Sequence, residues 1–367
     1  MLLESVAADG FRNLDGKFGC RAGLNVICGE NGHGKTNWLE AIHLLSTTKS
    51  FRTARLSEAI RFGASNAIVR GEVRQSDQIV RSLQVILEGN KKTLTVNGKK
   101  ETVQRYLGQL HAFVFNSDEL EIVRGGPEGR RKFLDNGIVS IFPPYVQTVS
   151  DYSKVLRQKN KLLQEARKNE TPVEKIEATL EPWNEQVVSL SARIHKARVR
   201  FVDRINEVLE RKLFDREEIS IRYASSLEGK GDLDDYESLI AERLALRTQA
   251  EIYSGYALIG PHRDDLEISF DGRDLRKFGS SGQQRSALLT LLIAEVSVFY
   301  EQQGEYPLFL IDDIDAELDY RRIGKLLDFL KGKTQTFVST SKESFVTQFG
   351  GEAEVIRIKE GRAESTA

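Results

Sequence analysis

The stretch LNVIC-GENGHGKT-NWLEAIHLL, residues 24–45, decides the fold of this chain. A short apolar strand (24–28) leads into a glycine-rich loop (29–36) and then into a helix-like run (37–45), which is the strand, loop and helix order of a P-loop. Glycines in such a loop let successive backbone N–H groups turn inward around phosphate oxygens, and a helix that begins near Lys35 adds the positive end of its dipole. The pattern predicts a phosphate-binding loop in an α/β fold.

The residue types in this loop have separate expected roles. Lys35 should reach the β and γ phosphates of a nucleotide, and Thr36 should offer its hydroxyl to Mg²⁺, which prefers oxygen ligands. A glycine-rich turn that merely precedes a helix is the weaker interpretation, because the strand and the helix both stand where a P-loop requires them. The nucleotide is expected to contact Gly29, Glu30, Asn31, Gly32, His33, Gly34, Lys35, Thr36 and Asn37.

A second acidic site separates ATPases from other P-loop proteins. The apolar run 306–311 reads as a buried strand that ends in Asp312 and Asp313, as expected for a Walker B strand beside the P-loop strand. Asp312 would hold Mg²⁺ directly or through water, and Asp313 would act as a catalytic residue with Lys35, by orienting or deprotonating the attacking water. Without the P-loop, an exposed acidic turn would be the better interpretation. Thr36 and Asp312 are 276 positions apart, so a large insertion must separate two adjacent strands.

The stretch between these motifs predicts two lobes. No proline occurs in residues 1–126, whereas five of the seven prolines lie between 127 and 182, which indicates a boundary near 127–145. Before it, 79–87 and 93–96 read as antiparallel strands. After it, helical periodicity predicts a hairpin of two helices with a turn at 170–172, the second helix being kinked or restarted at Pro182. We therefore expect an ATPase lobe of mixed sheets with flanking helices (1–126 and 250–367) and an inserted helical lobe (127–249).

Charge is distributed unevenly along the chain. The 53 Lys and Arg and 54 Asp and Glu give a formal net charge of −1, but residues 124–213 carry +6 and the remainder carries −7. Within the basic section, residues at three- or four-residue steps share one helical stripe: Arg193, Lys196, Arg200 and Arg204. A solvated helix face is the favoured interpretation of the stripe by itself. A DNA-binding surface is the alternative that the other motifs support.

Composition limits the class of protein. Apolar residues make up 40% and charged residues 29%, which is typical of a globular chain and excludes disorder as the main state. Cys20 and Cys28 are too few for a disulfide framework or a cysteine-rich zinc site. The first nine residues are acidic where a signal peptide is basic, and the most apolar stretch, 287–300, contains polar interruptions. We expect a cytoplasmic protein that makes no membrane contact.

A second anion site is predicted near the C-terminal end. The small residues of FGSSGQQR, residues 278–285, precede a helical run from 286 to 300. Two anion sites in one nucleotide-binding chain suggest that two chains share each nucleotide. The motif resembles the signature of ABC-type ATPases, in which Ser280 and Gly282 would touch the γ-phosphate held by the opposite subunit. This resemblance adds four nucleotide contacts, Ser280, Ser281, Gly282 and Gln283, and makes 316–319 similar to a D-loop that ends at Asp319.

Across nearly its full length the chain resembles the RecF family of the SMC-like ABC ATPases. The matching motifs occur in the family's order: FRNL (11–14), GKTNWLEAI (34–42), SFR (50–52), RRKFLD (130–135), GPHRDD (260–265), and 280–285 with 310–319. The resemblance implies an ATP-dependent homodimer that binds double-stranded DNA near single-stranded gaps and helps RecO and RecR load RecA, with slow, DNA-stimulated ATP hydrolysis releasing the dimer. Its similarity to the SMC-like branch also implies phosphate contacts by Arg12 and Arg52, for which a surface arginine is the alternative interpretation.

The chain departs from related patterns at two places. The family usually has Pro-Glu-Asp after the strand at 113–115, whereas this chain has Asn116-Ser117-Asp118, so Asn116 stands at the expected Q-loop position. The strand at 337–341 offers hydroxyls where ABC transporters have a switch histidine, which favours the repair branch. The competing interpretations are a transporter ATPase, a P-loop kinase and an SMC-like tether. A transporter ATPase would have the switch histidine, which this chain lacks. A P-loop kinase would give no role to residues 280–283 or Asp319. An SMC-like tether would need a longer coiled coil than this chain contains.

Overall fold

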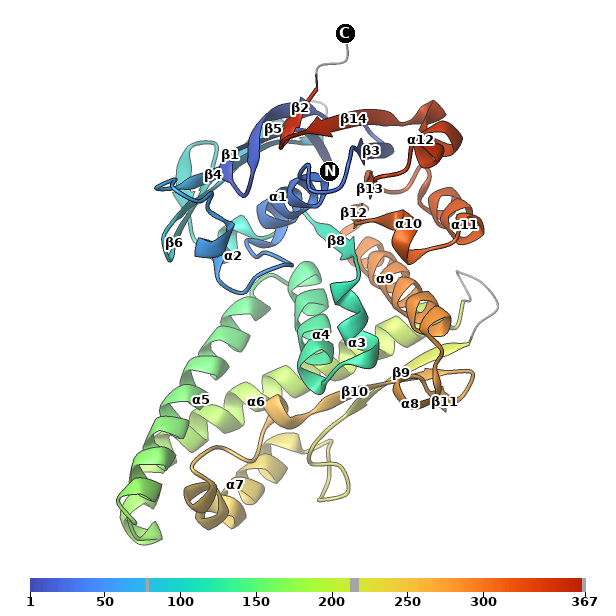
Figure 1. Ribbon diagram of the computed structural model, residues 1–367. Coiled ribbons are helices and arrows are strands. Elements are labelled where there is room, and N and C mark those ends of the chain that lie inside the picture. The colour runs from blue at the N-terminus through green and yellow to red at the C-terminus, as the bar shows by residue number, and fades with distance from the viewer. Residues whose placement is uncertain (77–78, 212–217, 365–367) are drawn as a thin grey trace. The chain divides into compact units, whose positions relative to one another are not determined.

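The computed structural model describes residues 1–76, 79–211 and 218–364. The chain divides into two compact units: unit 1 contains residues 1–120 and 291–367, and unit 2 contains residues 121–290. Figure 1 shows the elements of both units in chain order.

Unit 1 contains an antiparallel sheet with the strand order β2-β1-β4-β5-β6-β7. Its strands are β1 (Leu2–Phe11), β2 (Leu14–Gly19), β4 (Ala67–Ser76), β5 (Ile79–Glu88), β6 (Lys91–Val96) and β7 (Lys99–Glu101). The hairpin predicted over 79–96 is confirmed, because β5 and β6 pair antiparallel from Glu88 with Lys91 to Leu83 with Val96. Gly89 adopts a positive φ of 54° in the turn between them, a conformation that glycine takes at low cost.

The second sheet of unit 1 is mostly parallel and has the order β15-β14-β3-β13-β12-β8. Its strands are β3 (Leu24–Cys28), β8 (Ala112–Phe115), β12 (Leu308–Ile311), β13 (Thr336–Thr340), β14 (Glu354–Lys359) and β15 (Arg362–Ala363). β12 and β13 are buried along their whole length, as expected for parallel strands covered on both faces. The Walker B strand was expected beside the P-loop strand, and this is wrong: β13 pairs with both β3 and β12 and lies between them.

Unit 1 also contains helices. They are α1 (Lys35–Thr47), α2 (Val103–Tyr106), α10 (Ile314–Glu317), α11 (Tyr320–Leu330) and α12 (Glu343–Phe349), with single 3₁₀ turns at Leu56–Ala59, Asp118–Leu120 and Gly350–Glu352. Of these, α1, α10 and α12 contact strands of the parallel sheet and α2 contacts β6 of the antiparallel sheet. Trp38, Leu39 and Ile42 of α1 are fully buried in a core that includes strand residues of both sheets. This packing fixes the first turn of α1, and therefore the P-loop, against the sheet.

Unit 2 is built on long helices and a small antiparallel sheet. The helices are α3 (Glu121–Arg124), α4 (Pro127–Ile141), α5 (Tyr145–Lys168), α6 (Val173–Leu209), α7 (Tyr236–Ser254) and α8 (Leu275–Phe278), with a 3₁₀ turn at Pro261–Arg263. The strands are β9 (Ile219–Ala224), β10 (Asp265–Phe270) and β11 (Arg273–Asp274). α9 (Ser281–Gln303) is continuous across the division at residue 290.

The predicted helical hairpin is confirmed by α5 and α6, which are joined at 169–172 and lie side by side (Figure 1). The expected apolar face of α6 is buried at Val187, Ile194, Phe201, Ile205 and Val208. α6 continues through Pro182, so a new helix start at that residue is wrong.

The compact units have other bounds than the two lobes expected from the sequence. The sequence pattern places residues 250–290 in the first lobe, whereas they fall in unit 2. β10 pairs along its full length with β9, from Asp265 opposite Ala224 to Phe270 opposite Ile219, and α7 packs on α5 and α6. The boundary at 250 was expected because short apolar strands and helices return there, and this local pattern does not show that β10 pairs with β9.

Candidate functional site

The P-loop backbone has a shape that only glycine permits at two of its positions. Gly29 has a φ of 154°, and an added Cβ would lie 2.4 Å from the carbonyl oxygen of Ile358. Gly34, at the N-terminus of α1, has a φ of 103°, and an added Cβ would lie 2.9 Å from Asn13 Oδ1. The loop between them exposes its tip, residues 30–32. The strand, loop and helix order predicted for residues 24–45 is present, with the helix beginning at Lys35.

Lys35 lies inside the loop that it follows. Its Nζ donates hydrogen bonds to the carbonyl oxygens of Gly29 at 2.8 Å and Glu30 at 2.9 Å. Burial lowers the pKa of Lys35, while the negative charges of Asp313 and Asp312 act in the opposite direction. The loop therefore holds one ammonium group between its carbonyls and the Walker B carboxylates.

Thr36 and Asp312 meet across the sheet despite their separation in sequence. Thr36 Oγ1 donates to Asp312 Oδ1 at 2.9 Å, and Ser339 Oγ donates to the same oxygen at 2.6 Å. Burial raises the pKa of Asp312, and the two hydrogen bonds oppose that rise. Ser339 comes from β13, the strand between the P-loop strand and the Walker B strand. The hydroxyls of 337–341 are evident in the sequence, but the contact of Ser339 with Asp312 depends on the pairing of β13 with β12.

Asp313 has a left-handed backbone, with φ 47° and ψ 53°, at the N-terminus of α10. Its N–H donates to Ser339 Oγ at 2.7 Å, and its side chain is exposed. A non-glycine residue in this region costs about 1–3 kcal/mol and is commonly found at functional sites. Ser339 therefore connects both Walker B residues, through the carboxylate of Asp312 and the backbone of Asp313.

A buried carboxylate that was not predicted from the sequence contacts the arginines near the P-loop. Glu40 of α1 is fully buried and forms a paired contact with Arg12, whose Nε and Nη2 donate at 3.0 and 2.8 Å. Ser50 Oγ donates to Glu40 Oε1 at 2.5 Å, and Arg52 Nη1 lies 3.9 Å from Glu40 Oε2. Arg52 also donates to Asn37 Oδ1 in the first turn of α1. A charged residue on the buried face of the expected helix was the available signal for Glu40.

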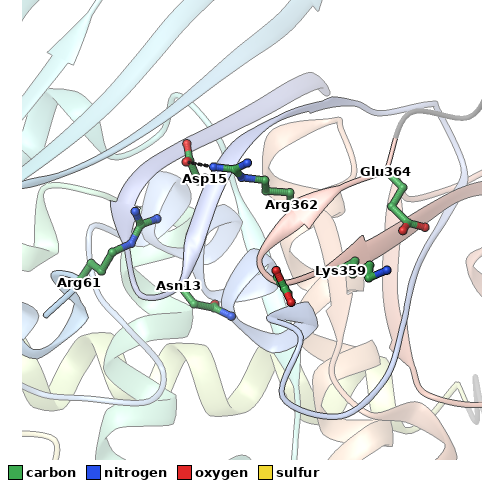
Figure 2. Close-up of a pocket in the computed structure, with 7 residues that line it drawn as sticks. Asn13, Asp15, Arg61, Lys359, Arg362 and Glu364 are labelled. Atoms are coloured by element: carbon green, nitrogen blue, oxygen red, sulfur yellow. Dashed lines mark hydrogen bonds and ion pairs between the residues drawn. The ribbon is translucent and has the colours of Figure 1, made fainter.

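A surface pocket of about 480 Å³ lies beside the segments that contact the P-loop (Figure 2). Asn13, which lines it, accepts a hydrogen bond from Asn37 at 2.7 Å, and Gly361, between two lining residues, donates to the carbonyl oxygen of His33 at 2.8 Å. Arg362 pairs with Asp15 at 2.8 Å across the pocket wall. The lining has three basic and three acidic side chains, which gives no excess positive charge for a further phosphate.

The signature segment lies in unit 2, and the helix that follows it starts closer to the segment than the sequence predicted. α9 starts at Ser281 rather than near 286. Ser280 Oγ accepts from the N–H of Gln283 at 3.3 Å, and Gln283 Oε1 accepts from the N–H of Ser280 at 2.8 Å, which is a capping box. Ser280, Ser281 and Gly282 are exposed. The helix N-terminus is therefore presented to solvent with its small residues outward.

Asp319, the end of the expected D-loop, caps α11 in unit 1. Its Oδ1 accepts from the N–H of Arg322 at 2.9 Å, and its side chain is exposed. Asn116, the expected Q-loop residue, is buried and accepts from the N–H of Glu119 at 2.9 Å. Each of these polar side chains has a local structural role in the chain.

The basic stripe lies on α6 of unit 2. Arg193, Lys196 and Arg200 are exposed and Arg204 is half-buried. Arg198, which lies among them in sequence, is buried instead and pairs with Asp135, donating from Nε and Nη2 at 2.9 Å each. The helix therefore separates its arginines between a solvent face and a buried ion pair.

Two motifs that carry the family resemblance form the polar core of unit 2. Arg130 donates to both carboxylate oxygens of Asp265, at 2.7 and 2.8 Å. Asp264 is fully buried and accepts from Tyr223 Oη and from the N–H of Ser226. These contacts connect α4 with β9 and β10. They account for RRKFLD and GPHRDD as structural motifs.

The histidines have surroundings that differ from one another. His33 Nε2 lies 3.7 Å from Glu30 Oε2 within the P-loop. Burial lowers the pKa of His43, His111 and His262 to about 4 in each case. His195 stacks on Tyr236 with ring centroids 3.9 Å apart. Among the described residues, no three His, Cys, Asp or Glu side chains gather as a metal site.

A family model and a curated relative both match nearly the whole chain. The model of the "RecF/RecN/SMC N terminal domain" family matches residues 2–366. The DNA replication and repair protein RecF of Halothermothrix orenii is 36% identical over 355 residues, which cover 93% of this chain and 92% of that protein. No helix in the described part of the chain is long and apolar enough to cross a membrane.

Two solved structures of the recombination mediator protein RecF in the RecFOR pathway are also similar. The structure of RecF-ATPrS has a TM-score of 0.88 at 31% identity and covers 100% of this chain and 98% of its own. The structure of RecF-ATP has a TM-score of 0.85 at 30% identity and covers 99% and 98%. The expected fold class, an ABC-type P-loop ATPase head with mixed sheets and flanking helices, is confirmed. The chain therefore belongs to the family of the DNA replication and repair protein RecF, in the SMC-like class of ABC ATPases.

Proposed function

We propose that this chain binds ATP at residues 29–37, and that ATP joins two copies of it on DNA. The observation that carries the proposal is the 2.9 Å contact between Thr36 and Asp312, which brings a P-loop hydroxyl to a Walker B carboxylate from 276 positions away. Lys35 holds the phosphates of the nucleotide. The similarity to the structure of RecF-ATP supports this assignment, and so does the geometry of the P-loop.

Thr36 and Asp312 fit Mg²⁺ because they place a hydroxyl and a carboxylate oxygen side by side. Mg²⁺ is usually bound by one or two protein oxygen ligands, with substrate phosphates and water completing its shell. A bound cation would supply charge neutralisation for the phosphates. It would also offset the cost of burying the Asp312 carboxylate, which raises the pKa of that group.

Asp313 is the residue best placed to orient or deprotonate the water that attacks the γ-phosphate. Its carboxylate is exposed. Its backbone N–H donates to Ser339 Oγ, which in turn donates to Asp312 Oδ1. Arg12 donates to Glu40 of α1, the helix that follows the P-loop. Arg12 is the proposed additional phosphate contact. Hydrolysis is slow, is stimulated by DNA and ends the bound state, so that ATP acts as a switch for association.

The second half of each nucleotide site comes from the opposite copy. Four residues contribute at the start of a 23-residue helix, where backbone N–H groups attract phosphate: the exposed small residues Ser280, Ser281 and Gly282, and the half-buried Gln283. Asp319 contributes to the same interface from the D-loop. ATP therefore drives formation of a homodimer in which each nucleotide is shared.

The DNA ligand is duplex DNA next to a single-stranded gap, where the dimer acts with RecR and RecO to promote loading of RecA. The basic stripe of Arg193, Lys196, Arg200 and Arg204 contacts backbone phosphates, which gives sequence-independent and salt-sensitive binding. The exposure of three of the four side chains and the +6 charge of residues 124–213 support this surface.

A charge-reversal variant tests the DNA surface. Arg193, Lys196 and Arg200 are replaced together by glutamate, and gel-shift titrations compare duplex, single-stranded and gapped DNA with ATP, ADP and no nucleotide. We expect weaker binding to duplex and gapped DNA, a smaller salt dependence, and unchanged binding of a fluorescent ATP analogue. Equal DNA affinity in the variant and the unmodified chain would contradict the assignment.

A further inference from the structure

Phe278 is an exposed aromatic residue directly before the signature segment. Its side chain is 70% exposed, although Leu275, one turn earlier in α8, is buried. Most of the apolar surface of this ring is therefore left in contact with solvent. Exposed apolar groups that adjoin a recognition motif are commonly parts of an interaction surface.

The backbone holds this ring outward. Asp274 caps α8 by accepting from the N–H groups of Arg276 at 3.0 Å and Lys277 at 3.2 Å. At Gly279 an added Cβ would lie 2.4 Å from Leu275 Cδ1 and 2.5 Å from its carbonyl oxygen, so the chain turns tightly against α8. The ring is therefore presented on a fixed turn, and its immobilisation costs less entropy on binding than that of a flexible side chain.

A surface pocket of about 290 Å³ joins the ring to the signature segment. Phe278 and Gln283 both line the pocket, and Gln283 also closes the capping box with Ser280. The floor includes Phe270 and Leu275, which are almost completely buried. The ring, the pocket and the helix N-terminus thus form one continuous surface.

We propose that Phe278 is an anchor of the interface between two copies of this chain and becomes buried when ATP brings them together. The inference rests on the proposed function, in which Ser280 meets the P-loop of a second copy. Two residues span at most about 7 Å of chain, so Phe278 lies within reach of a surface that covers Ser280. An aromatic ring next to the desolvated centre of an interface carries a large share of its binding energy. A second copy is the occupant because it is the partner that the signature segment requires.

Symmetry doubles the effect of a substitution at this position. A two-fold interface contains the residue twice, once from each copy. Loss of one anchoring ring weakens association about tenfold. Loss of both rings in Phe278→Ala should therefore raise the dissociation constant of the dimer by about 100-fold.

The test is sedimentation equilibrium with ATP in an Asp313→Asn background, which slows hydrolysis. Phe278→Ala is compared with Phe142→Ala, a matched control whose ring is 58% exposed in the same unit but distant in sequence from the signature. We expect the dimer to weaken about 100-fold only in the Phe278 variant. Phe278→Lys, which keeps a long exposed side chain, provides a second variant and should weaken the dimer further. Thermal melting checks that both variants fold.

The outcomes separate this inference from the function on which it rests. If the unmodified chain remains monomeric with ATP, the shared-site function fails, and the inference fails with it. If the unmodified chain forms a dimer and both Phe278 variants form it equally well, the inference alone is overturned. Binding of a fluorescent ATP analogue, measured where the protein is monomeric, should be unchanged. A loss there would assign the ring to the nucleotide instead of the partner.

Discussion

Replacing Gly29 by alanine tests the backbone geometry on which the P-loop depends. The new Cβ would lie 2.4 Å from the carbonyl oxygen of Ile358 in β14 and 3.4 Å from its carbonyl carbon. Both atoms are backbone, and β14 is paired with β3, so relief requires movement of the sheet. Such overpacking costs about 1–3 kcal/mol, and the positive φ adds about 1–2 kcal/mol. We expect Gly29→Ala to lower the free energy of unfolding by about 2–5 kcal/mol.

Gly32→Ala provides the matched comparison. Gly32 also has a positive φ, 83°, but an added Cβ would meet nothing within 4 Å. It should cost only the backbone strain, about 1–2 kcal/mol. Urea unfolding followed by fluorescence of the buried Trp38, in a Trp183→Phe background, reports on unit 1. A Gly29 variant that loses no more stability than the Gly32 variant would refute the steric reasoning.

Two further predictions concern charged side chains. Burial raises the pKa of Asp312 in the folded chain above its value in the unfolded chain. The stabilisation that the protonated carboxyl gives is therefore complete below the unfolded pKa. It is lost as the pH rises through the folded pKa. Asp312→Asn should remove this part of the pH dependence in metal-free urea titrations, and an unchanged pH profile would contradict it. Arg12→Ala leaves the fully buried Glu40 carboxylate without its main partner and should cost about 3–5 kcal/mol. Arg74→Ala breaks a partly exposed pair with Glu4 and should cost at most about 1 kcal/mol, so equal losses would refute the role of burial.

The P-loop was predictable because its function is encoded locally. Phosphate binding requires glycines, a lysine and a helix N-terminus within about a dozen residues, and all of them occur between residues 24 and 45. The hairpin of β5 and β6 and the pair α5 and α6 were predictable for the same reason. Each has its periodicity and its turn within one continuous segment.

Contacts between distant segments were not predictable in this way. The position of β13 between β3 and β12 depends on strand pairing, which no local pattern specifies, and Ser339 enters the site only through that pairing. The position of Glu40 on the buried face of α1 could have marked it as unusual, but its partner Arg12, 28 positions earlier, is identified only by the folded chain. Residues 250–290 fall in unit 2, where β10 pairs with β9, although their short apolar strands and helices predicted a place in the first lobe.

The most direct test of the shared nucleotide site is a mixing experiment with two defective variants. Lys35→Ala removes the P-loop ammonium, and Ser280→Arg blocks the signature segment. A mixed dimer contains one site in which both defects meet and one site with an intact P-loop and an intact signature. We expect neither variant to hydrolyse ATP alone and their mixture to recover activity, up to one working site per mixed dimer. If the mixture stays inactive, or if Ser280→Arg alone hydrolyses ATP at the unmodified rate, each subunit does not depend on its partner in the way described.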